Sequence, residues 1–100
     1  MGLLIKKEHL NILLSIFTSY CPNAEIWAYG SRLKGNAHEG SDLDLVVKSF
    51  GERNKSVYTL LDMINDSNIP FIVDIHEYNS LSESFQKEIL KQYIVIFNKK

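Results

Sequence analysis

Two aspartates lie two residues apart in the segment Ser-Asp-Leu-Asp-Leu-Val-Val-Lys, residues 41–48. The alternation of polar and apolar residues predicts a β-strand, in which side chains at i and i+2 point to the same face. Asp42 and Asp44 should therefore lie side by side, while Leu43 and Leu45 point to the core. Two such carboxylates repel each other unless a cation is bound, and their oxygens suit Mg²⁺ or Mn²⁺. The pair alone leaves a solvated strand edge open as an alternative.

Gly30 and Ser31 follow a segment rich in β-forming residues and predict a phosphate-binding turn. Glycine lets a phosphate approach the backbone closely. Ser31 can begin a short helix whose free N–H groups face an anion, and Arg32 and Lys34 add positive charge nearby. Gly-Ser alone is also an ordinary turn. A turn of this kind followed by a strand with two metal-binding carboxylates is typical of nucleoside triphosphate chemistry.

Asp74 is a lone acid in the apolar segment Phe-Ile-Val-Asp-Ile-His, residues 71–76, which also reads as a strand. A charge in such a strand must be paired or must bind a metal. If this strand lies beside the one that carries the two aspartates, Asp74 completes a cluster of three carboxylates. The alternative is an ion pair with a lysine or arginine of a helix. His76 shares the face of Asp74, and its role is left open.

The remaining periodicities supply the elements that must position these residues. Apolar residues at helical spacing predict helices over 6–20 and 52–66, and β-forming runs predict strands over 25–29 and 93–97. Ser80 and Glu83 have the spacing of a capping box before a third helix. The order α-β-β-α-β-α-β predicts an α+β, or mixed α/β, fold in which helices pack on a small mixed sheet. Without repeats or linkers, residues 1–100 are expected to form a single domain.

Composition narrows the class of protein further. The net charge is -1, so extended nucleic-acid binding is not expected. The single cysteine excludes a disulfide framework, and a thiolate zinc site is not expected. No apolar run approaches the roughly 18 residues of a membrane span, and no signal peptide is evident, so we expect a cytoplasmic protein.

Gly30-Ser31, ten residues, and then Asp42-Leu43-Asp44 resembles the GSx10DxD signature of the nucleotidyltransferase superfamily, which includes DNA polymerase β. The fuller string from Tyr29 to Leu45 resembles the minimal branch of that superfamily, the MNT domains. The resemblance extends over nearly the whole chain and implies the nucleotidyltransferase fold.

The resemblance implies nucleotide-binding roles for three residues. Gly30 and Ser31 would hold the β- and γ-phosphates of a nucleoside triphosphate, with ATP as the suggested substrate. Arg32 matches the Gly-Ser-Arg of the family, either in contact with the triphosphate or as a support of the loop.

The resemblance also implies catalytic and metal-binding roles for the three aspartates. Asp42 and Asp44 would bind two Mg²⁺ ions. Asp74 would bind the catalytic ion and help to deprotonate the acceptor hydroxyl, so that attack on the α-phosphorus releases pyrophosphate.

MNT domains are often the antitoxin partners of HEPN toxins. The resemblance therefore implies transfer of AMP from ATP to a tyrosine of a HEPN ribonuclease toxin. Two alternatives stay open: a non-catalytic module that neutralises its partner by contact, and nucleotidyl transfer to a small molecule or RNA. The acceptor site is expected to come from a partner or a second subunit, and the sequence leaves a homo- or hetero-oligomer open.

Overall fold

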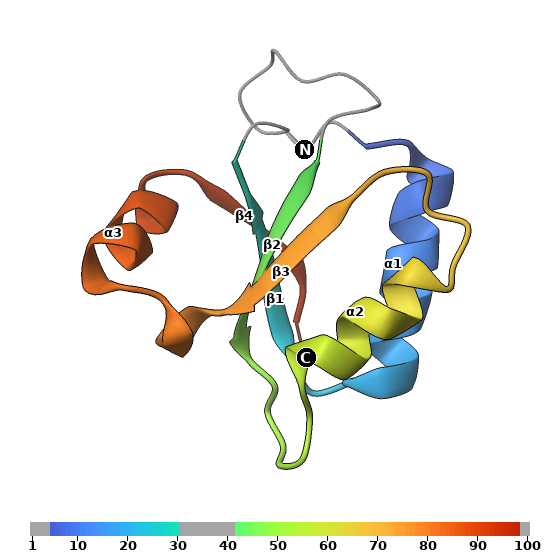
Figure 1. Ribbon diagram of the computed structural model, residues 1–100, viewed down its shortest axis with the longest axis horizontal. Coiled ribbons are helices and arrows are strands. Elements are labelled where there is room, and N and C mark those ends of the chain that lie inside the picture. Colours follow the sequence, from blue (N-terminus) through green and yellow to red (C-terminus); the bar gives the residue numbers. More distant parts are fainter. Residues whose placement is uncertain (1–4, 31–41, 99–100) are drawn as a thin grey trace.

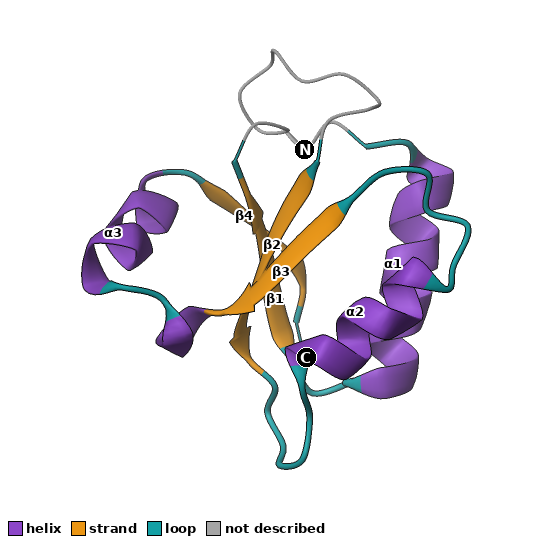
Figure 2. Ribbon diagram, viewed as in Figure 1, coloured by secondary structure: helices purple, strands orange, loops and turns teal. Residues whose placement is uncertain are grey.

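In the computed structural model, which describes residues 5–30 and 42–98, helices pack on both faces of one mixed sheet (Figures 1 and 2). The elements follow the predicted order α-β-β-α-β-α-β, with one additional 3₁₀ turn. In chain order they are α1 (Lys7–Tyr20), β1 (Glu25–Tyr29), β2 (Leu43–Ser49), α2 (Val57–Asn65), β3 (Val73–Glu77), the 3₁₀ turn η2 (Tyr78–Ser80), α3 (Glu83–Lys91) and β4 (Tyr93–Phe97).

The sheet has the strand order β3-β2-β1-β4. Strand β1 is antiparallel to both β2 and β4, and β2 is parallel to β3, so the predicted mixed sheet is confirmed. Helix α2 provides the crossover that two parallel strands need. Because of these directions, the end of β1 and the beginnings of β2 and β3 meet at one end of the sheet, the upper end in Figure 1. Gly30, Asp42, Asp44 and Asp74 lie at this end.

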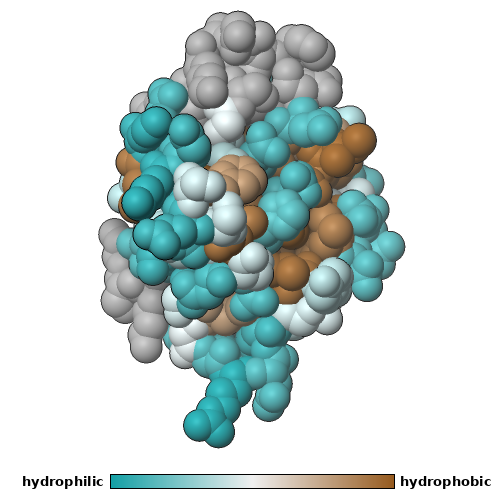
Figure 3. All heavy atoms as spheres, turned by 60° about the vertical axis from the view of Figure 1, so that its left-hand side comes forward, coloured by the Kyte–Doolittle hydropathy of each residue, from teal (hydrophilic) through white to brown (hydrophobic). Residues whose placement is uncertain are grey.

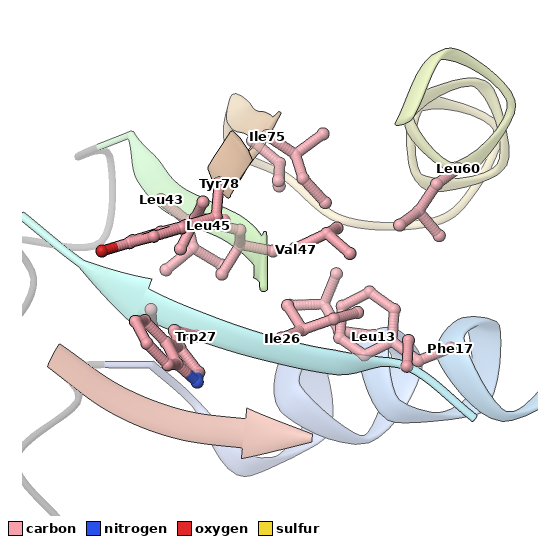
Figure 4. Close-up of a cluster of buried hydrophobic side chains, with 14 of the residues drawn as sticks. Leu13, Phe17, Ile26, Trp27, Leu43, Leu45, Val47, Leu60, Ile75 and Tyr78 are labelled. Carbon is pink, nitrogen blue, oxygen red and sulfur yellow. The ribbon is translucent and has the colours of Figure 1, made fainter. Parts of the chain in front are cut away.

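Helices α1 and α2 cover one face of the sheet and enclose the core (Figure 1). Figure 4 shows Leu13 and Phe17 of α1 pointing toward Ile26, and Leu60 of α2 pointing toward the sheet. These side chains have no exposed surface. Leu43 and Leu45 of β2 are also fully buried in this core, as the alternation of the sequence predicts. The residue between them, Asp44, therefore points to the opposite face.

Helix α3 lies on that opposite face and covers it only partly (Figure 1). Ile89 is the buried residue of α3, whereas Phe85 and Leu90 remain 41% and 50% exposed. The sheet beneath presents aromatic rings, among them Trp27, which stacks on Tyr93 at 4.1 Å between centroids. Figure 3 turns this side forward and shows hydrophobic atoms in separate groups between hydrophilic ones. This face is the more accessible one.

The second helix begins at Val57, later than the predicted start at residue 52. Gly51 and Asn54 adopt positive φ angles of 72° and 64°, which a right-handed helix does not contain. Ser56 is the N-cap, and its hydroxyl accepts a hydrogen bond from the Tyr58 N–H at 3.0 Å. The predicted end at residue 66 is close, since the helix stops at Asn65.

The capping box predicted at Ser80 is wrong. Ser82 is the N-cap of α3, and its hydroxyl accepts a hydrogen bond from the Phe85 N–H at 3.2 Å. Ser80 lies in the 3₁₀ turn, where its hydroxyl donates to the Glu77 carbonyl at 2.7 Å. The third strand is also displaced by one or two residues, because it begins at Val73 and ends at Glu77. None of the helices within residues 5–30 and 42–98 has the length and hydropathy that a bilayer crossing requires.

We predict that Cys21 resists thiol reagents in the folded protein. Its side chain has no exposed surface, and burial raises the pKa of the thiol from 9.0 to about 11. Intact-mass measurement after iodoacetamide treatment at pH 8 should show no adduct natively and one adduct in guanidinium chloride. Because the unfolded thiol loses its proton first, this group lowers the free energy of unfolding as pH rises from 9.0 to about 11. Rapid labelling of the folded protein would contradict the burial.

Candidate active site

The parallel pairing of β2 and β3 places Asp44 directly beside Asp74. Adjacent strands lie about 4.8 Å apart, and residues in register on parallel strands point to the same face. Leu43 and Val73, the preceding pair in the same register, are both buried on the face that α1 and α2 cover. The two carboxylates therefore share the open face. From the sequence, this proximity was predicted only if the two strands are neighbours. The structure shows that they are, and it brings Asp44 and Asp74 together.

The pKa of Asp44 reflects the repulsion between these neighbouring carboxylates. Its pKa is raised above 3.8, first by burial and then by the negative charges of Asp74 and Asp42, with a partial offset from His76. Every acidic contribution thus favours the neutral form of Asp44. A site in which like charges raise one another's pKa is suited to a cation, which would reverse the effect.

Asp42 and Asp74 are more exposed than Asp44. Asp42 precedes the first residue of β2 and is exposed, yet its charge reaches Asp44. The Oδ1 atom of Asp74 lies 3.3 Å from Nε2 of His76, and both side chains are about half exposed. The basic neighbour of Asp74 among the described residues is therefore an imidazole of its own strand, rather than the helix lysine or arginine considered from the sequence.

Gly30 directly follows the last residue of β1, at the same end of the sheet, and lies close to the Asp44 side chain. Its φ angle is +88°, a conformation that glycine adopts without strain, and a Cβ atom here would collide with Oδ2 of Asp44. The backbone of the predicted phosphate-binding turn therefore begins in contact with a predicted metal-binding carboxylate. The other predicted nucleotide-binding residues, Ser31 and Arg32, lie outside the described residues, as does Lys34.

The oxygen atoms of the three aspartates fit a divalent cation whose remaining ligands come from the substrate. The three aspartates offer hard oxygen ligands, and the raised pKa of Asp44 shows that their charges act on one another. In residues 5–30 and 42–98, no three acidic, histidine or cysteine side chains form a group ready to hold a metal ion. Mg²⁺ usually binds through one or two carboxylates together with substrate phosphates, rather than in an all-protein cage. An open pair such as Asp44 and Asp74 matches that mode.

Two aromatic residues extend the site beyond what the sequence indicated. Tyr29 pairs with Asp44 in the register of β1 and β2, and its ring meets the ring of Phe85 edge-on at 5.9 Å. Burial, followed by the charges of Asp44 and Asp74, raises the pKa of Tyr29 to about 12. Neither Tyr29 nor Phe85 was predicted from the sequence to belong to the site. The position of Tyr29 immediately before Gly30 was the available signal.

The comparison with known families agrees with this geometry. Residues 11–100 match the family described as "Polymerase beta, Nucleotidyltransferase". The chain belongs to this nucleotidyltransferase family, and the resemblance seen in its sequence is confirmed.

The chain is also similar to two individual proteins. The chain is 37% identical over 100 residues to the probable protein adenylyltransferase MntA of Haemophilus influenzae, with 95% of this chain and 84% of the relative covered. A solved structure titled "Crystal structure of the toxin-antitoxin with AMP-PNP" superposes with a TM-score of 0.70 at 19% identity, covering 91% of this chain and 74% of that one. The second likeness shows the fold, and the nucleotidyltransferase fold is confirmed.

Replacing Gly30 with alanine should damage the site more than the fold. The new Cβ must displace the Asp44 carboxylate, and a misplacement of about 1 Å can reduce a rate about a hundredfold. The positive φ angle should also cost about 1–3 kcal/mol of stability. Nucleotidyl transfer and thermal unfolding of Gly30→Ala measure the two effects.

Gly51→Ala is the matched control for that variant. Gly51 also has a positive φ angle, and its added Cβ would collide with the backbone carbonyl of Asn23, away from the aspartates. This variant should lose at least as much stability, because a backbone carbonyl cannot move aside as a side chain can, and should keep the activity of its folded fraction. Equal loss of activity in both variants would show that general destabilisation explains the result.

Asp44→Asn should stabilise the metal-free protein while it abolishes transfer. Since the folded-state pKa of Asp44 is raised, ionisation of this group above pH 3.8 opposes folding, and the neutral amide removes that cost. Thermal unfolding at pH 7 in EDTA should give a higher midpoint for the variant than for the parent protein. Added Mg²⁺ should raise the midpoint of the parent more than that of the variant. A lower midpoint for the variant in EDTA would refute the electrostatic account.

Proposed function

We propose that the chain transfers AMP from ATP to a tyrosine hydroxyl of a HEPN-type ribonuclease toxin and so acts as its antitoxin. The observation that carries this proposal is the pairing of Asp44 with Asp74 beside the end of β1 at Gly30. The name of the relative from H. influenzae, a probable protein adenylyltransferase, supports AMP as the transferred group. The toxin–antitoxin complex with AMP-PNP supports a toxin as partner and an adenine nucleotide as substrate.

The three aspartates would hold two Mg²⁺ ions in this reaction. Asp42 and Asp44 would contribute to both ions, and Asp74 to the catalytic one. When bound, the ions lower the pKa of the attacking hydroxyl and neutralise the charge of the pyrophosphate. Asp44 would then be fully ionised at neutral pH, because a cation opposes the acidic neighbours that raise its pKa.

The chain's own residues position the reactants. The backbone at Gly30, with Ser31 and Arg32, would bind the β- and γ-phosphates. Asp74, half exposed at the beginning of β3, would accept the proton of the acceptor hydroxyl. The hydroxyl oxygen then forms a bond to the α-phosphorus while the bond from that phosphorus to the α,β-bridging oxygen breaks. Pyrophosphate leaves with the electron pair, and the acceptor retains AMP.

A protein acceptor suits the surface around this site. The net charge of -1 provides no basic field for an RNA chain. Tyr93 and Val95 of β4 are exposed hydrophobic side chains on the same face of the sheet as Asp44. A protein can pack against such groups. We further propose that the reaction takes place in the cytoplasm, where ATP and the RNA targets of a ribonuclease toxin are found.

The test uses the purified protein, Mg²⁺, the co-purifying partner and ATP labelled separately at the α- and the γ-phosphate. Label on the partner from the α-position only, lost in Asp42→Ala, is the expected result. Label from the γ-position would indicate a kinase-like reaction and overturn the mechanism. No label from either position would favour a module that acts by contact alone.

The contact-only alternative predicts a different result in cells. A triple Asp→Asn variant at positions 42, 44 and 74 keeps the side-chain volumes and removes the carboxylates. We expect this variant to be expressed and to bind the toxin without relieving its growth arrest. Full neutralisation by the variant would refute catalysis as the basis of the antitoxin effect.

A further inference from the structure

A hollow of about 600 Å³ lies between the end of β1 and helix α3. It is lined by Tyr29, Gly30, Phe85, Glu88, Ile89, Lys91 and Gln92. Its volume is in the range of small-molecule sites, which are mostly apolar with a few polar groups that fix the orientation of a ligand. None of its lining residues is one of the aspartates that carry the proposed chemistry.

The lining has one aromatic side and one charged side. The rings of Tyr29 and Phe85 meet edge-on, with an angle of 85° between their planes, and Tyr29 is buried, so the accessible aromatic surface is that of Phe85. Phe85 is 41% exposed although it is aromatic. On the charged side, Lys91 and Glu88 form an ion pair at 3.2 Å. The hollow therefore offers flat apolar surface bordered by groups that can form hydrogen bonds.

The hollow is continuous with the acidic site. Gly30 belongs to its wall and is in contact with the Asp44 carboxylate, and Tyr29 pairs with Asp44 across the strands. A molecule anchored at the aspartates through a phosphate could extend past Gly30 into the hollow. The carboxylates disfavour a second anion here, and the ion pair of Glu88 with Lys91 adds no net charge, so the hollow suits an uncharged part of the ligand.

We propose that this hollow binds the nucleoside part of the nucleotide, with the base against the ring of Phe85. A nucleobase is flat, uncharged and aromatic, and bases stack on aromatic side chains in proteins. Tyr29 lies between the two parts of the site, with the acidic residues on one side and Phe85 on the other. This inference rests on the proposed function, since it assumes that the aspartates bind a nucleoside triphosphate.

The test separates the nucleoside from the triphosphate. Binding of α,β-methylene-ATP and of inorganic tripolyphosphate is measured by calorimetry with Mg²⁺ and without any acceptor. Phe85→Ala should weaken binding of the ATP analogue about tenfold, the effect of losing one base stack, and leave tripolyphosphate binding unchanged. Phe85→Tyr should restore binding of the analogue.

Leu90→Ala is the matched control, because Leu90 lies on the same helix, is similarly exposed and does not line the hollow. It should bind both ligands like the parent protein. Unchanged binding of the analogue by Phe85→Ala would overturn this inference alone. A parent protein that binds neither ligand would overturn the proposed function together with it. Equal weakening of both ligands would show that Phe85 acts on the fold or on the phosphate site, which also overturns the inference.

Discussion

The pairing of β2 with β3 holds two like charges together, and the rest of the site depends on it. Asp44 and Asp74 would separate if either strand shifted by one residue. A one-residue shift of β2 would also turn the buried Leu43 and Leu45 to the open face, and a one-residue shift of β3 would turn Val73 and Ile75 there. Burial of each of these side chains contributes roughly 1.5–3 kcal/mol. Two charges about 4 Å apart near a surface repel by about 1–4 kcal/mol. The core therefore outweighs the repulsion and fixes the register.

The two faces of the sheet divide structure from chemistry. The face under α1 and α2 is closed by fully buried residues such as Leu13, Phe17 and Leu60. Among the described residues, the nine residues of α3, of which Ile89 is buried, and Tyr78 of η2, whose ring meets that of Trp27, cover the other face in part. Because each β-strand alternates its side chains between these faces, a single strand such as β2 contributes leucines to the core and an aspartate to the site. Incomplete cover on the α3 face leaves room for a ligand.

The sequence identifies the parts of the site that depend on local spacing. Asp44 on β2, Asp42 directly before that strand and Gly30 directly after β1 were indicated by a period of two and by the chemistry of each residue type. The proximity of Asp74 to Asp44 could be predicted only from the strand order, which the local sequence does not contain. Positive φ angles at Gly51 and Asn54 keep residues 51–56 out of α2, which begins at Val57, the first residue of its apolar stripe. The competing serines Ser80 and Ser82 could not be ranked as N-caps without the backbone path.

The aromatic part of the site shows what residue spacing cannot predict. Tyr29 and Phe85 are 56 positions apart in the chain, and only the crossing of α3 over β1 brings their rings together. Burial, followed by the charges of Asp44 and Asp74, raises the pKa of Tyr29 to about 12, so its phenol stays protonated at neutral pH. Tyr29 can therefore donate a hydrogen bond without deepening the repulsion among the carboxylates. An uncharged aromatic boundary between the acidic site and the hollow lets one nucleotide present its phosphates to a cation and its base to a ring.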